Sequence, residues 1–208
     1  MADWREAAWQ ELEAALATAA GAPGTGCRLR LSNEGATRAL GYCLAAALGP
    51  GDAALLSGPL GAGKSALARA VIQARLADPS ADVPSPSYTL VNVYETAAGL
   101  PIWHADLYRL GDPEELIEIG LEEAFADCIA LIEWPERLEN PPARRLEITL
   151  APLPGAEETG RMAMITCRGA WPALSGLATH REAPGPTAQA PQNTASGSPL
   201  QQAREGLT

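Results

Sequence analysis

The segment GPLGAGKS, residues 58–65, contains Lys64, the only lysine of the chain. The other fourteen basic residues are arginines, so one position keeps a residue whose charge sits on a compact ammonium group. The spacing fits the phosphate-binding pattern GxxxxGK[ST], in which Lys64 would contact the outer phosphates of a nucleotide and the Ser65 hydroxyl would ligate Mg²⁺. The alternative is an ordinary glycine turn before a helix, but a chance match has a probability of roughly one in a thousand.

The residues around this motif predict the elements that would hold it. An apolar run precedes it at 53–56, and a helical pattern follows at 66–71. The expected order is strand, loop and helix, which is the context in which this motif binds phosphate. Gly58, Gly61 and Gly63 would let the backbone curl so that its N–H groups face phosphate oxygens, helped by the positive end of the helix.

Two acidic residues follow other apolar runs. Glu133 ends the run IALIE, where α/β sheets bind their ligands, and could complete a Mg²⁺ site; a surface glutamate is the alternative. Asp106 follows IWHA and could be a second carboxylate beside the metal or orient a water molecule; a turn cap is the alternative. His104 shares a strand face with Asp106, where a buried or supporting histidine is more common than a catalytic base.

A loop of hydroxyl side chains is expected after the motif's helix. It contains Ser85, Ser87, Tyr88 and Thr89, and it could act as a nucleotide sensor of the switch type. Ordinary turn chemistry explains Ser-Pro-Ser nearly as well.

The apolar pattern predicts an α/β domain with a P-loop NTPase fold, in three layers around a mixed sheet with a parallel centre and antiparallel flanking strands. One helix is expected to begin at a Ser32 cap, one to run from the motif to about Ala77, and one to span 112–127 behind an Asp112 cap. The strands are expected near 29–31, 53–57, at the end of 85–95 after a loop, and near 100–105, 129–134, 146–150 and 162–167.

Length and composition allow one substantial core. The chain has 208 residues, 47% of them hydrophobic, and we expect one globular domain at 28–177. Residues 1–27 are predicted to form a helical extension and a linker that ends in GAPGTG. Residues 178–208 are rich in Pro, Ala, Gln, Ser and Gly and are predicted to be a disordered tail.

The charge and the cysteines narrow the class of protein. The net charge is −10, and residues 106–158 alone hold fourteen acids and four arginines, a balance that argues against direct nucleic-acid binding. The four cysteines form no CxxC pair, and the N-terminus is acidic, unlike a signal peptide. No apolar run approaches the roughly 20 residues of a membrane span. We therefore expect a soluble, cytoplasmic protein with reduced cysteines.

Four segments, in this order and at these separations, resemble the TsaE (YjeE) family of bacterial P-loop ATPases: GPLGAGKS, SPSYTLVNVYE, HADLYRLGDPEEL and IEWPER. The resemblance covers residues 28–177. It implies an ATPase required for threonylcarbamoyladenosine (t6A) formation on tRNAs that read codons beginning with A. Such a protein would bind the complex of TsaB and TsaD, reset it by ATP hydrolysis, and meet tRNA only through that complex.

The resemblance also implies roles for residues of the motif and the acids. Residues 58–65, Ala62 included, would bind the phosphates of ATP. Ser65 and Glu133 would ligate Mg²⁺, and Asp106 would be the acid needed for activity, either on the metal or beside the attacking water. The expected catalytic set is thus Lys64, Asp106 and Glu133.

The resemblance assigns two further residues to the nucleotide site. Glu34, in the turn that enters the first core helix, would lie near the nucleotide, and Trp134 would follow the metal acid beside it. The chain has Ser65 and Ser87 where the family usually has Thr, and both substitutions keep a hydroxyl.

Two other functions remain possible from the sequence. A small-molecule kinase shares the P-loop but would need an arginine-rich lid, whereas the downstream half of this chain is acidic. A nucleotide-binding regulatory module without significant turnover is the second. A GTPase switch is excluded, because an NKxD motif needs a second lysine.

The predicted helix at 112–127 carries seven acids and no base. Glu115, Glu118 and Glu122 would form one stripe along it. A solvated face is the ordinary interpretation. The alternative is that the stripe docks on a basic surface of the TsaB and TsaD complex.

Overall fold

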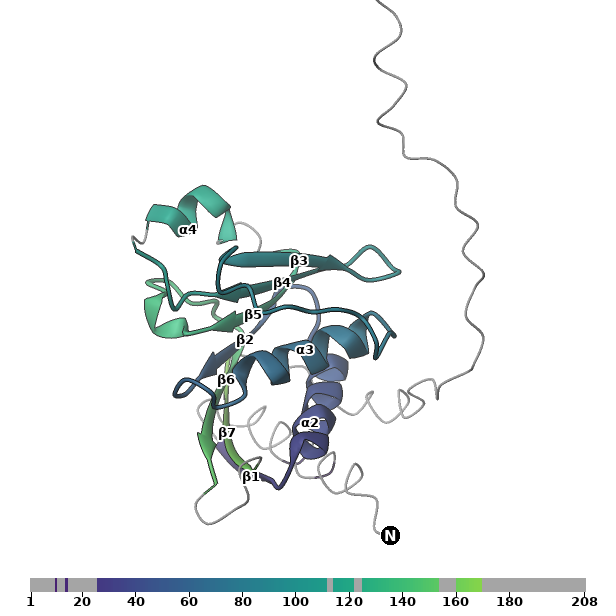
Figure 1. Cartoon of the computed structure of the whole chain (residues 1–208). Helices are drawn as coiled ribbons and strands as arrows, with labels where there is room; N and C mark the ends of the chain where they lie inside the picture. Colours follow the sequence, from purple (N-terminus) through teal and green to yellow (C-terminus); the bar gives the residue numbers. More distant parts are fainter. Residues whose placement is uncertain are drawn as a thin grey trace, which may run out of the picture.

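The computed structural model describes Gln10, Ala14 and residues 26–111, 114–121, 125–153 and 160–169. Its centre is a seven-stranded sheet with the order β1-β7-β6-β2-β5-β4-β3 (Figure 1). The strands are β1 (Gly26–Leu31), β2 (Asp52–Ser57), β3 (Val91–Glu95), β4 (Pro101–Asp106), β5 (Ile129–Glu133), β6 (Arg145–Pro152) and β7 (Arg161–Arg168). The helices are α2 (Glu34–Ala47), α3 (Lys64–Arg75), α4 (Glu114–Ile119) and the 3₁₀ turn η1 (Pro135–Arg137).

The strand directions confirm the predicted mixed sheet. β2 runs parallel to both β5 and β6, and β5 runs parallel to β4. The flanking pairs are antiparallel: β3 with β4, β6 with β7, and β7 with β1. The parallel centre therefore directs the carboxyl ends of β2, β5 and β4 to one edge of the sheet, where ligands bind in folds of this class.

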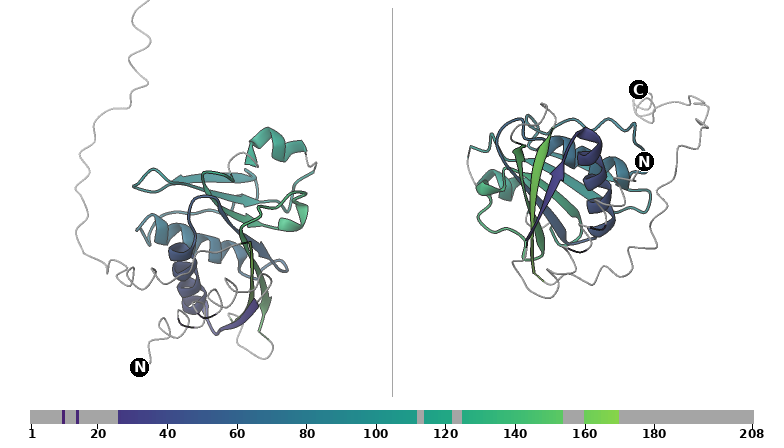
Figure 2. Two further views of the ribbon diagram at one scale, coloured as in Figure 1. Left: turned by 180° about the vertical axis from the view of Figure 1, so that it is seen from behind. Right: turned by 90° about the horizontal axis from the view of Figure 1, so that it is seen from below.

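Both faces of the central strands are covered. On one face α2 and α3 lie side by side, and their apolar residues share a core with Ala54 and Leu56 of β2 (Figures 1 and 2). On the other face Ala53 and Leu55 pack in a second cluster with Leu116 of α4. Strands buried on both faces read as continuous apolar runs, which is why 53–56 and 129–132 were recognisable in the sequence.

Two details of the predicted helices were wrong. The side chain that caps α2 is Asn33, not Ser32, and its Oδ1 accepts a hydrogen bond from the backbone N–H of Ala36 at 3.0 Å. The helix expected at 112–127 is not continuous: α4 ends at Ile119, and Gly120, with a φ of 72°, interrupts it before Leu121, which is helical again.

Other predictions fall on residues that the structure leaves undescribed. They are the Asp112 cap, almost all of the N-terminal extension, and the tail at 178–208. No disulfide joins the cysteines Cys27, Cys43, Cys128 and Cys167. Burial raises the pKa of the Cys43 thiol to about 12.

Within the described ranges, every helix is too short or too polar to cross a membrane.

The close contact of α2 with α3 gives a test of the packing. A Cβ on Gly41 would lie 2.4 Å from the Cβ of Ala70, so Gly41→Ala must push the helices apart. We expect a loss of about 1–3 kcal/mol in the free energy of unfolding, seen as a melting temperature lower by several degrees. The matched control is Gly49→Ala, whose Cβ would meet only Asp52 Oδ2, at 3.6 Å. Equal melting temperatures for the two variants would contradict this packing.

Candidate functional site

The loop between β2 and α3 has the backbone that its glycines predict. Gly58 has a φ of 133°, and a Cβ there would lie 2.2 Å from the carbonyl oxygen of Leu150, so a side chain is excluded. Gly61 and Gly63 also have positive φ, at 76° and 99°. Gly63 is the N-cap of α3, and no side chain caps that helix. The positive end of α3 therefore opens onto the loop, an arrangement suited to an anion.

The Lys64 ammonium is held inside this loop. Its Nζ donates hydrogen bonds to the carbonyl oxygens of Gly58 at 2.8 Å and Pro59 at 3.1 Å, and the side chain is buried. The same Nζ lies 3.9 Å from the centre of the Trp134 ring. Burial lowers the pKa of Lys64, and the nearby carboxylates of Glu133 and Asp106 act in the opposite direction.

Glu133 ends β5 and meets the first turn of α3. Its Oε2 accepts a hydrogen bond from the Ser65 hydroxyl at 2.9 Å, and its Oε1 lies 2.9 Å from His104 Nε2. Glu133 is only 2% exposed. Two of the residues predicted at the Mg²⁺ site, Ser65 and Glu133, are thus in contact although 68 positions separate them.

Asp106 lies beside Glu133, because the register of β4 and β5 pairs these two residues directly. Asp106 Oδ2 accepts a hydrogen bond from the Ser87 hydroxyl at 2.6 Å, and Ser85 approaches the same oxygen at 3.5 Å. Asp106 Oδ1 accepts a hydrogen bond from the backbone N–H of Tyr108 at 3.1 Å. The predicted loop of hydroxyl side chains is therefore hydrogen-bonded to Asp106.

Trp134 turns the chain out of β5 in a left-handed conformation, with φ 58° and ψ 52°. Its backbone N–H donates to the Leu56 carbonyl of β2 at 3.2 Å. Its ring lies against Tyr108, with 4.8 Å between the ring centroids. Together with the contact to Lys64, this forms an aromatic wall on one side of the loop.

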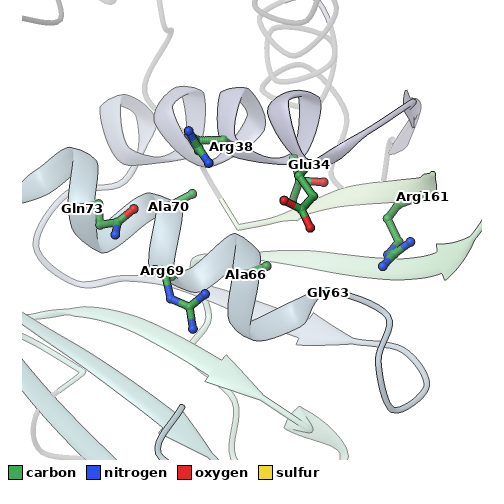
Figure 3. Close-up of a pocket in the computed structure, with 9 residues that line it drawn as sticks. Glu34, Arg38, Gly63, Ala66, Arg69, Ala70, Gln73 and Arg161 are labelled. Carbon is green, nitrogen blue, oxygen red and sulfur yellow. The ribbon is translucent and has the colours of Figure 1, made fainter. Parts of the chain in front are cut away.

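Glu34 lies apart from these side chains, at a cavity that none of them lines. It begins α2 and lines a cavity of about 180 Å³ between α2 and α3 (Figure 3). The cavity is lined by Glu34, Thr37, Arg38, Gly63, Ala66, Arg69, Ala70, Gln73 and Arg161. Because Gly63 lines it, the cavity adjoins the glycine loop.

Arg161 was missed by the sequence reasoning. It begins β7, and its Nε donates to the Ala62 carbonyl at 2.9 Å across 99 positions of sequence. Figure 3 shows its side chain near the glycine loop, with Glu34 across the cavity. No motif includes Arg161, so the sequence held no signal for this contact.

The described residues offer oxygen ligands for a metal. The available donors are the Ser65 hydroxyl and the carboxylates of Glu133 and Asp106, which suit a hard cation such as Mg²⁺. Over the same residues, no group of three or more His, Cys, Asp or Glu side chains could hold a metal alone. Mg²⁺ commonly takes only one or two carboxylates and completes its shell with phosphate oxygens and water, so the donor set fits.

Comparisons with known proteins identify the family of the chain. The family model described as "Threonylcarbamoyl adenosine biosynthesis protein TsaE" matches residues 31–159. Similar proteins named as tRNA threonylcarbamoyladenosine biosynthesis protein TsaE occur in Rickettsia felis and Nostoc sp. The first is 41% identical over 54% of this chain and 64% of the relative, and the second 33% identical over 67% and 85%.

A solved structure shares the fold. YdiB of Bacillus subtilis superposes with a TM-score of 0.58 at 27% identity, over 76% of this chain and 98% of that protein. The family model spans the glycine loop, both acids and Trp134, which are the residues assembled at the edge of the sheet. The chain therefore belongs to the TsaE family of threonylcarbamoyl adenosine biosynthesis proteins.

Proposed function

We propose that this protein is a Mg²⁺-dependent ATPase that acts in t6A formation on tRNA. The observation that carries the proposal is the hydrogen bond between Ser65 and Glu133, because it joins the first turn of the P-loop helix to the acid at the end of β5. These are the two protein ligands that a P-loop nucleotide site needs for its metal. The family name supports the pathway.

The phosphates of ATP would lie in the glycine loop. Backbone N–H groups of residues 58–65 and the positive end of α3 would bind phosphate oxygens, and the Lys64 ammonium would move onto the outer phosphates. Glu34 and Arg161, at the neighbouring cavity, would contact the remainder of the nucleotide. The position of the cavity supports this placement of the nucleotide, because the cavity adjoins Gly63, where the phosphate loop meets α3.

Mg²⁺ would be held by Ser65 and Glu133, with Asp106 next to them, and would neutralise charge on the phosphates. Asp106 would orient the attacking water, directly or from the metal. Its present hydrogen bonds to Ser87 and Tyr108 fix its carboxylate at the same edge. Trp134 would exclude water from the side of Lys64 that its ring covers.

Partner proteins TsaB and TsaD would bind around this site, and tRNA would be reached through them. Large apolar side chains beside the site are exposed: Leu60 in the glycine loop is 79% exposed and Tyr88 in the hydroxyl loop 85%. Exposed apolar groups at the edge of a site support contact with another protein. The acidic stripe stays a prediction, because only Glu115 of its three side chains is described.

Lys64 provides the first test. Lys64→Ala should remove most of the affinity for Mg²⁺–ATP, since each charge-assisted bond to phosphate is worth about 1.5–3 kcal/mol, or at least about tenfold in affinity. Lys64→Arg should also fail, because the guanidinium is larger and planar where a compact charge is needed. Calorimetric titration measures both. An affinity of Lys64→Ala within twofold of the unsubstituted protein would refute the P-loop assignment.

The two acids provide the second test. Glu133→Gln and Asp106→Asn should each reduce ATP turnover in the presence of TsaB and TsaD by roughly 10²-fold, with a much smaller loss of nucleotide affinity. The exposed Glu139→Gln serves as the matched control and should keep full turnover. Phosphate release is measured with and without the partners. Normal turnover in either variant would show that the substituted acid does not have the proposed role.

The same assay separates the alternatives. Phosphate transfer to a sugar, nucleoside or amino acid in place of release would identify a kinase. Tight ATP binding with no turnover, alone or with partners, would identify a regulatory module.

A further inference from the structure

We propose that His104 is a positioning residue that fixes the Glu133 carboxylate, so that Oε2 is the oxygen presented to Ser65 and to the metal. The inference rests on the proposed function, because it concerns the metal side of that site. It assigns His104 no direct role in the chemistry of the phosphates.

His104 is buried in the sheet, and its side chain contacts the Glu133 carboxylate. It lies in the interior of β4, opposite Leu131 of β5, and is completely buried. Alternation along β4 directs His104 to the same face as Asp106, and this is the face on which α3 packs. The imidazole is therefore on the core side of the sheet and is buried at least as deeply as either acid.

The Glu133 carboxylate is bound at both oxygens. Oε1 lies 2.9 Å from His104 Nε2, and Oε2 accepts from the Ser65 hydroxyl at 2.9 Å. Two contacts on opposite oxygens fix the rotation of the carboxylate about its last bond. When the Ser65 hydroxyl turns to a metal ion, the contact with His104 still holds the carboxylate in place. Side chains that hydrogen-bond to a metal ligand orient it. Replacing such a side chain typically lowers metal affinity or activity about 10–100-fold.

The direction of the hydrogen bond follows from the chemistry of the two groups. An ionised carboxylate can only accept, so His104 Nε2 must carry the proton, and in the neutral ring Nδ1 is then the acceptor. Among the described residues, Nδ1 has no hydrogen-bond partner. A buried acceptor without a partner destabilises the fold, a cost that Phe or Leu would not bring to this position. A role in packing alone does not account for histidine here, and the contact with Glu133 does.

The test separates metal binding from nucleotide binding. His104→Phe keeps a flat ring and removes the donor, whereas His104→Gln places an amide N–H near the position of Nε2. The control Ile102→Val alters packing on the same strand face, two residues earlier and opposite Ile129 of β5. A fluorescent ATP analogue reports nucleotide affinity in EDTA, and Mg²⁺ titration of each protein with the analogue bound reports metal affinity.

His104→Phe should weaken Mg²⁺ about 10–100-fold while nucleotide affinity in EDTA stays within about twofold. His104→Gln should recover most of the metal affinity, and Ile102→Val should match the unsubstituted protein. Unchanged Mg²⁺ affinity in a folded His104→Phe variant would overturn the proposal, as would an equal loss in Ile102→Val. If the unsubstituted protein bound no Mg²⁺–nucleotide, the proposed function itself would fail.

A second readout needs neither metal nor nucleotide. The chain has two histidines, His104 and His180, so His180→Ala leaves a single imidazole to observe. Nitrogen-15 NMR of that protein should show the proton on Nε2 and a bare Nδ1. A proton on Nδ1 alone would overturn the proposal even if the Phe variant failed to fold.

Discussion

The parallel pairing of β2, β5 and β4 is the constraint on which the site depends. Its register places Leu56 opposite Glu133, and Glu133 opposite Asp106, so the glycine loop and both acids emerge at one edge of the sheet. The backbone N–H of Trp134 donates to Leu56, so the same pairing continues into the turn that carries the aromatic wall. A slip of one residue would turn either acid to the other face of the sheet and separate it from α3.

The charged side chains at this edge of the sheet are buried, and each needs polar partners. Lys64, Asp106 and Glu133 are each less than 5% exposed, and a charge at such depth is tolerated only with partners. Backbone carbonyls hold the ammonium, hydroxyls and a backbone N–H hold the carboxylates, and His104 holds the remaining oxygen of Glu133. Under the proposed function, a phosphate chain and a cation would replace several of these partners.

The sequence predicted the parts of this arrangement that depend on local pattern. The glycine loop was visible because Gly58 must lack a side chain, and β5 because a strand buried on both faces is apolar throughout. Contacts across the fold left no local trace: Arg161 with Ala62, and the orientation of His104 toward Glu133, depend on which strands become neighbours. The end of α4 was missed for another reason, since Gly120 can continue a helix or leave it and composition does not decide which.

A crystal structure of the protein with Mg²⁺ and a non-hydrolysable ATP analogue tests the proposed nucleotide site most directly. We predict that the phosphates lie in the loop of residues 58–65, that Mg²⁺ contacts the Ser65 hydroxyl and Glu133 Oε2, and that Lys64 Nζ contacts the outer phosphates. A nucleotide bound elsewhere, or a metal ion with no contact to Glu133, would contradict it.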